Sequence, residues 1–226
     1  MNALTRQFSF TAPQVPLADP TDGLLPLKAL EAPVEVNILI WDTMQTGHFV
    51  QLMLDDKLVG QTRAKTEDEH PGDIISMYLD EKYLAEEGSH VLAFKVTNPE
   101  NGVYEDSPTT VLLVDRTAPG ATLLAPAIFP QITFGDMLHG TIPGYAGMEP
   151  GDVIQTICNG VEGPALVISP DHLTKHPIQI TLDRPFLDSL NSESVRVSYH
   201  VTDRAGNRSI DAQAVDLTYQ RSMLAN

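Results

Sequence analysis

The chain has 226 residues, 30 of them acidic and 14 basic, which gives a formal net charge of −16. This balance excludes nucleic acid as a partner, because affinity for phosphates depends on Lys and Arg. Hydrophobic residues make up 42% of the chain, enough to bury a core. No apolar run approaches the roughly 20 residues that cross a bilayer. The 17 prolines and 15 glycines favour many short strands over a helical bundle.

Residues 1–21 contain Pro13, Pro16 and Pro20 and no regular apolar period, which is typical of a leader or linker. They also lack the apolar stretch of an N-terminal signal peptide. Retention inside the cell, export without such a signal and loss of an upstream region are three alternatives that this segment leaves open.

Residues 22–116 predict a β domain. The expected elements are strands at 34–40, 90–97 and 111–114, a helical turn within 80–87 and a chain reversal at 98–102. Leu92, Phe94 and Val96 alternate with less apolar residues, and a period of two with one apolar face is typical of a half-buried antiparallel strand. This first copy holds 18 acidic and 7 basic residues, against 11 and 6 in residues 117–221. We expect the excess of acidic residues to keep the protein soluble, and the functional alternative is cation binding or repulsion from an anionic surface.

Residues 117–221 repeat the first copy. At an offset of 103 residues the segment 150–163 matches 47–60, and at an offset of 105 the apolar face of 197–201 matches that of 92–96. In residues 195–202, Val195, Val197, Tyr199 and Val201 share one face, between a helical turn at 186–190 and a chain reversal at 203–207.

We therefore predict an all-β protein of two tandem immunoglobulin-like antiparallel β-sandwich domains, since about seven short strands per roughly 100 residues is the count that such a sandwich needs. The expected organisation is a leader or linker at 1–21, domains at 22–116 and 117–221, and a tail at 222–226.

The sequence contains no nucleophile elbow, phosphate-binding loop or dinucleotide fingerprint. His172 and His176 have the spacing of two metal ligands on a helix, but Pro170 and Pro177 flank them and no glutamate lies between them, so we expect a loop or a single turn and no zinc. The charged run 67–70 is expected to be a solvated loop. Cys158, the one cysteine, excludes a disulfide within the chain and is expected to be inert. We predict a protein that is not an enzyme, with no catalytic, cofactor-binding or metal-binding residues.

Three motifs resemble those of bacterial Ig-like domains. The segment 199–209 (YHVTDRAGNRS) resembles the Y-x-V-x-D-x-A-G-N-x-S ending of such domains, and 114–119 (VDRTAP) resembles the junction between consecutive ones. Pro150-Gly-Asp152, with the turn at Asn159-Gly160, resembles their early hairpin. The likeness covers both copies, although 98–102 (NPENG) departs from the ending motif and 217–221 is not followed by a Thr-Ala-Pro junction.

This resemblance implies a function and a location. Such domains occur in tandem in large adhesins and biofilm-associated surface proteins, so we expect a non-catalytic spacer or adhesive stalk, secreted or on the cell surface. Its partners would be other domains of a larger chain, or a host or cell-surface receptor or glycan. The alternative is a carbohydrate- or receptor-binding module attached to a toxin or secreted enzyme, in which Tyr104 or Tyr145 contacts ligand. Trp41 and the six tyrosines could form a sugar-binding platform, but core packing is what we expect of Trp41.

Some relatives bind calcium between domains, and Asp115 and Asp203 match the positions that would supply ligands. Calcium needs six to eight oxygen ligands, however, and the sequence contains no dense run of alternating aspartates. The alternative is that Asp203 and Asn207 bond to the amides of their own turn. We therefore assign no cofactor, and calcium stays an alternative.

Overall fold

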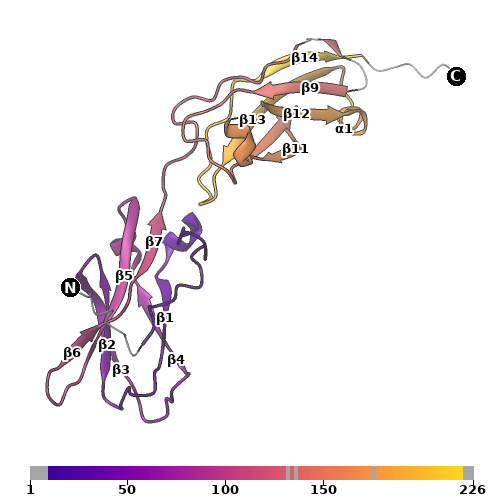
Figure 1. Ribbon diagram of the computed structural model, residues 1–226. Helices are drawn as coiled ribbons and strands as arrows, with labels where there is room; N and C mark the ends of the chain where they lie inside the picture. Colours follow the sequence, from indigo (N-terminus) through magenta and orange to yellow (C-terminus); the bar gives the residue numbers. More distant parts are fainter. Residues whose placement is uncertain (1–9, 131–132, 135–136, 175–176, 221–226) are drawn as a thin grey trace. The chain divides into compact units, whose positions relative to one another are not determined.

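The computed structural model describes residues 10–130, 133–134, 137–174 and 177–220 (Figure 1). The chain divides into two compact units, Met1–Arg116 and Thr117–Asn226. Regular structure is almost entirely β-strand, as predicted, and the helices are short. None of the helices in the described ranges is long and apolar enough to cross a membrane.

The first unit is a sandwich of two antiparallel sheets. The smaller sheet pairs β1 (Val34–Leu39) with β4 (Ile74–Leu79), and the larger has the order β3 (Lys57–Ala64), β2 (Phe49–Leu54), β5 (Gly88–Thr97). The outer edge of β5 is shared by β6 (Tyr104–Asp106) and β7 (Thr110–Val114). Two short helices complete the unit, η1 (Leu27–Glu31) and η2 (Glu81–Leu84). Side chains from both sheets, such as Ile38, Leu52, Ile75 and Phe94, form one buried core.

The second unit has the same strand order. Its smaller sheet pairs β9 (Met137–Ile142) with β12 (Ile178–Asp183), and its larger sheet runs β11 (Val161–Val167), β10 (Val153–Cys158), β13 (Ser194–Thr202), β14 (Val215–Tyr219), β8 (Thr133–Phe134). Its short helices are η3 (Pro170–Leu173) and α1 (Arg184–Ser189). The chain is therefore a pair of immunoglobulin-like β-sandwiches.

Both predicted alternating strands are confirmed. Leu92, Phe94 and Val96 are buried on β5, and the four apolar residues of the predicted face are buried on β13. The predicted helical turns coincide with η2 and overlap α1.

The strand register corrects the sequence alignment by one residue at β2 and β10. Phe49 faces Thr97 in the first unit and Val153 faces Thr202 in the second, so the offset between these two strands is 104 residues and not 103. Cys158 therefore corresponds to Leu54. A shift of one residue exchanges the inward and outward faces of a strand. The pattern of buried side chains therefore determines the alignment of β2 with β10, which sequence similarity alone placed one residue out of register.

The prediction of a leader or linker at 1–21 is corrected for residues 10–21. Phe10 and Val15 are buried in the core of the first unit, and Gln14 exchanges two backbone hydrogen bonds with Asn37 of β1. Burial of these two side chains outweighs the linker-like proline content. Residues 1–9 and the predicted tail at 222–226 lie outside the described residues.

A serine maintains the hydrogen-bond ladder where each larger sheet bends. In the first unit Ser107 donates its N–H to the Phe94 carbonyl (2.8 Å), and its Oγ accepts the Phe94 N–H (2.9 Å). The next residue, Pro108, has no N–H to contribute. In the second unit Ser209 makes the same pair of bonds to Val201, both 2.8 Å. The backbone groups at the bend are thus paired in both units.

Candidate functional site

Asp203 is fixed within its turn. Its Oδ1 accepts the backbone N–H groups of Gly206 and Asn207, each at 2.8 Å, and its Oδ2 accepts the side-chain amide of Asn207 at 2.9 Å. In the first unit Asn98 stands at the start of the corresponding hairpin and accepts the N–H of Glu100 at 2.9 Å. The contacts of Asp203 are those of a turn residue, and they already use both of its carboxylate oxygens.

Metal-binding geometry is absent from the described part of the chain. No group of three or more His, Cys, Asp or Glu side chains there could hold a metal ion. Asp115, the other residue that the calcium alternative named, is half-buried beyond the end of β7.

Tyr145 is not an exposed aromatic platform, which corrects one of the two positions expected to contact ligand. Its hydroxyl donates to Oδ2 of the buried Asp152 at 2.8 Å, and the same oxygen accepts the N–H of Glu149 at 3.1 Å. Burial, followed by this hydrogen bond, raises the pKa of Tyr145 well above its usual value. The Pro-Gly-Asp motif thus supplies a carboxylate that ties the loop together.

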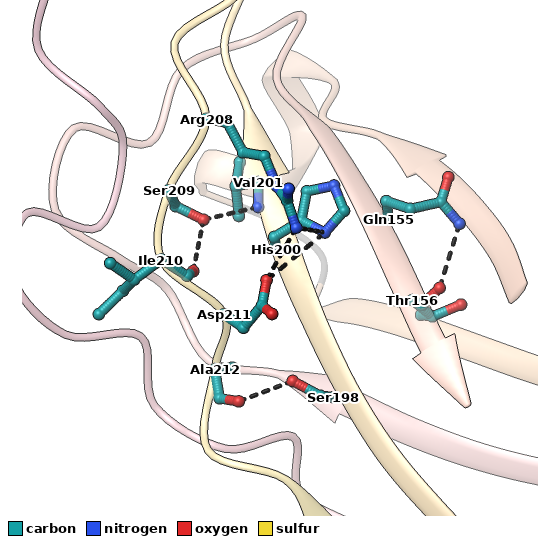
Figure 2. A network of polar contacts seen from close by, with 10 residues as sticks. All are labelled: Gln155, Thr156, Ser198, His200, Val201, Arg208, Ser209, Ile210, Asp211 and Ala212. Atoms are coloured by element: carbon teal, nitrogen blue, oxygen red, sulfur yellow. Dashed lines mark hydrogen bonds and ion pairs between the residues drawn. The ribbon is translucent and has the colours of Figure 1, made fainter. Parts of the chain in front are cut away.

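A polar network lies along β13 (Figure 2). Arg208 donates through Nη2 to Asp211 Oδ1 at 3.0 Å and to His200 Nδ1 at 3.3 Å. Burial, and then the charge of Arg208, lowers the pKa of His200, so the imidazole is neutral at pH 7 and can accept this bond. Ser198 donates to the Ala212 carbonyl at 2.6 Å. The network holds residues 208–212 against β13, so its role is structural.

The other reactive side chains singled out in the sequence also have local roles. His172 lies in the short helix η3, and its Nδ1 accepts the N–H of Ser169 at 3.0 Å. His176 lies outside the described residues. Cys158 is buried in the core, and burial raises its pKa to about 11, which keeps the thiol protonated. Glu69 forms an ion pair with Arg63 at the surface.

One pocket in the first unit combines aromatic and polar side chains. Its volume is about 230 Å³, and it lies at the end of the sandwich where β5 turns into β6. The lining residues are Phe10, Trp41, Thr43, His48, Val96, Asn98, Asn101, Val103, Tyr104 and Glu105. Tyr104 is 61% exposed, and Lys95 Nζ lies 3.9 Å from the centre of its ring.

Trp41 is half-buried at the base of this pocket. Its ring centroid lies 4.6 Å from that of Phe10 and 6.2 Å from that of Phe94, both of which belong to the core. The expected core packing of Trp41 is thus correct for one part of the side chain, while another part lines the pocket.

No family model matches the chain, and no curated protein sequence is significantly similar to it. Solved structures do resemble it. An adhesin that helps an Antarctic bacterium bind ice, described as Ca2+-stabilized, has a TM-score of 0.50 and 15% identity over 96% of this chain and 50% of its own. A 1.5-MDa bacterial ice-binding adhesin has a TM-score of 0.48 and 15% identity over 95% of this chain and 66% of its own. The fibronectin(III)-like modules of Clostridium thermocellum CbhA have a TM-score of 0.49 and 12% identity over 95% of this chain and 97% of theirs.

At these identities the likeness concerns the fold alone. The chain spans about two thirds of one adhesin chain and half of the other.

Sequence reasoning missed the pocket. It named Trp41 and the tyrosines as a possible sugar-binding platform and expected Trp41 in the core, but it did not bring Trp41 and Tyr104 together with Asn98, Asn101 and Glu105. The available signal was the clustering of polar residues around one aromatic in the hairpin 98–105, next to the strand predicted at 90–97.

Proposed function

We propose that the chain is a non-catalytic adhesion module whose two sandwiches act as a spacer in a bacterial surface or secreted protein. The observation that carries this proposal is the parallel pairing of a segment near the start of each unit with the last strand of that unit. In the first unit Leu25 donates its N–H to the Leu113 carbonyl, and Leu113 donates to the Gly23 carbonyl, each at 2.9 Å, in a parallel bridge. In the second unit β8 pairs in parallel with β14.

This pairing suits a segment under tension. In a parallel pair, the incoming end of one strand and the outgoing end of the other lie at opposite ends of the pair. A pull on the two ends of a unit therefore slides the strands along each other and loads their hydrogen bonds together. An antiparallel hairpin pulled apart at its open end would lose its bonds one at a time.

Gly23 provides the test. It has a φ of +79°, and a Cβ at this position would collide with the Val111 carbonyl oxygen. Gly23→Ala should therefore separate this segment from β7 and lower the unfolding force of one unit in single-molecule stretching of the full chain. Gly47→Ala is the matched control, because Gly47 also has a positive φ (+87°) but has open space around its Cβ position. Equal unfolding forces for the two variants would show that the parallel pairing of residues 23–25 with β7 does not resist stretching.

A larger parent chain is part of the same proposal, with other domains of that chain as partners. An immunoblot of whole cells and medium should then detect a product much heavier than 24.7 kDa. A product near 24.7 kDa would favour the second function that we propose, a free-standing glycan- or receptor-binding module. The exposed Tyr104 at the rim of the pocket supports this second function.

A further inference from the structure

The aromatic side of the pocket consists of one fixed ring and one exposed ring. Trp41 packs against Phe10 and Phe94, so its indole is held in place from the core side. Tyr104 projects from the start of β6 and is 61% exposed. Aromatic faces carry partial negative charge and attract the weakly positive C–H groups of an apolar ring face. Tyr104 pairs with Thr97, and its ring centre lies 3.9 Å from Lys95 Nζ, so this ring stands on the outward face of the sheet at the rim of the pocket, while Trp41 lies on the core side. A flat ligand with C–H groups on its faces fits against Trp41 and reaches Tyr104 at the rim.

The polar side of the pocket comes from the hairpin that links β5 to β6. Asn98 Oδ1 accepts the N–H of Glu100, and Asn101 Oδ1 accepts the N–H of Val103, each at 2.9 Å. These bonds hold both carboxamide groups in place. Within the described residues neither amide nitrogen donates to a protein acceptor, so both keep their donors for a ligand.

Three further residues of the lining, Glu105, Thr43 and His48, carry polar side chains. Glu105 is half-buried on β6 and supplies a carboxylate, and Thr43 supplies a hydroxyl. The Nδ1 of His48 accepts the N–H of Gln45 (3.4 Å), which leaves the proton on Nε2. This Nε2 is enclosed, and no described residue accepts a hydrogen bond from it, so the donors that face a ligand are the two amide groups and the Thr43 hydroxyl. Adjacent hydroxyl groups, each a donor and an acceptor, match such a mixture.

Size and charge narrow the class of ligand. A volume of about 230 Å³ is below the roughly 300–1,000 Å³ of pockets for drug-sized molecules, so it suits a single ring. The described lining contains a glutamate and neither lysine nor arginine, in a unit where acidic residues far outnumber basic ones. Lys95 Nζ lies 3.9 Å from the centre of the Tyr104 ring, but it is paired with Asp106 at 3.4 Å. The carboxylate of Glu105 therefore disfavours an anionic sugar.

Strand pairing places the pocket at one end of the first sandwich. β5 pairs with β6 near Thr97, whereas Gly88 at its other end pairs with Val114, the last residue of β7. The lining residues Val96, Asn98 and Glu105 are therefore at the end of the first sandwich opposite to the end where β7 leaves.

We propose that this pocket binds one neutral sugar ring, the terminal residue of a glycan, which lies against Trp41, reaches Tyr104 at the rim and is hydrogen-bonded by Asn98, Asn101 and Glu105. The proposal deepens the second function proposed above and does not depend on the spacer role, which stretching measurements test separately.

Trp41 provides the readout, because it is the single tryptophan of the chain. The full chain is titrated with neutral hexoses, N-acetylhexosamines and fucose, and in parallel with sialic acid and a proline-rich peptide, while tryptophan fluorescence is followed. A glycan array extends the same panel to terminal residues of longer chains. We expect saturable binding of a neutral sugar with a Kd of about 1 mM, as for a single ring with few contacts.

Three variants separate a binding role from a structural one. Tyr104→Ala should weaken binding by about tenfold, and Tyr104→Phe should retain it because the ring face remains. Tyr78→Ala removes a tyrosine that is 63% exposed on β4, outside the pocket, and should bind like the parent chain. The proposal is overturned if no neutral sugar binds in either assay, if only sialic acid or the peptide binds, or if Tyr78→Ala weakens binding as much as Tyr104→Ala.

Discussion

Asp55 and Asn159 show how a single residue fixes the hairpin between the second and third strands of each sandwich. Both have positive φ values, 48° and 51°. Each side chain also accepts a backbone N–H from the neighbouring long strand at 2.8 Å, from Val91 and Arg196 respectively. Asn and Asp both tolerate positive φ and accept hydrogen bonds from nearby amides. This explains why the first unit has Asp and the second unit has Asn at the same position of the hairpin.

At the bend of the larger sheet, Ser107→Ala should destabilise the first unit by about 1–3 kcal/mol, because the Phe94 N–H would lose its acceptor inside the sandwich. Urea unfolding followed by Trp41 fluorescence measures this change. Ser76→Ala is the control, since Ser76 is exposed on β4, and its effect should stay within about 0.5 kcal/mol. Equal midpoints for the two variants would contradict the role of Ser107.

His90 links β5 to the hairpin turn at Asp55. Its Nδ1–H donates to Asp55 Oδ2 at 2.8 Å, and its Nε2–H donates to the Glu86 carbonyl at 2.9 Å. Burial lowers the pKa of His90, but these two bonds outweigh it, and the net pKa is raised. Burial likewise raises the pKa of Asp55, but bonds from Val91 and His90 leave it lowered.

These directions set the pH window of the pair. The raised His90 pKa contributes stability below its ordinary value of 6.5, and this contribution is lost as pH rises through the folded-state pKa. The lowered Asp55 pKa contributes above its ordinary value of 3.8. His90→Gln should therefore destabilise the first unit more at about pH 5.5 than at about pH 8.5, measured by urea midpoints. A pH-independent effect of His90→Gln would refute the ion pair.

Among the elements, β9 contains a glycine where β1 has a valine. Gly140 faces Ile180, just as Val36 faces Met77. A Cβ at Gly140 would lie 2.5 Å from the ring of Phe129, so this ring fills the space that the valine side chain occupies in the first unit.

Gly140→Ala should accordingly destabilise the second unit by about 1–3 kcal/mol through overpacking. Phe129→Ala should also destabilise it, by leaving a cavity. The double variant Gly140→Val with Phe129→Ala should lose clearly less than the sum of Gly140→Val and Phe129→Ala alone, as calorimetry would show. Additive losses would mean that the two side chains do not compete for one space.

The hairpin after β13 carries a prediction about metal removal. Asp203→Ala should lower the melting temperature of the second unit by about 4–8 °C, because two backbone amides lose their acceptor. EDTA should leave the melting temperature of the unchanged protein as it is, since the carboxylate is already bonded within the turn. A fall on adding EDTA, reversed by calcium, would show that the protein binds this ion.

At the scale of the whole molecule, the net charge of −16 limits contacts between copies. The larger sheets have β3 and β11 at their edges, and both strands are mostly exposed. Such edges offer unpaired backbone groups to other chains, and like charge keeps the copies apart. Light scattering should therefore show self-association as pH falls towards the isoelectric point of about 4.6. A constant hydrodynamic radius down to this pH would show that charge is not what separates the molecules.

The sequence by itself determined the architecture of two sandwiches, the alternating strands at 90–97 and 195–202 and the chain reversals at 98–102 and 203–207. These features depend on local patterns: the alternation on β5 and β13 must bury one face, and Asn, Asp and Gly mark the reversals. Of the site, it identified Tyr104 as exposed and Asp203 as a turn residue.

Only the tertiary structure decided which distant residues meet. Phe10 joins a core built from strands that begin more than twenty positions later, and strand pairing brings Trp41 and Tyr104 to one pocket. The pairing register of β10 with β13 and the hydrogen bond that holds the Tyr145 hydroxyl on Asp152 also depend on packing. Burial and pairing are set by partners that a local pattern does not contain, so periodicity determines the elements while contacts between them determine the site.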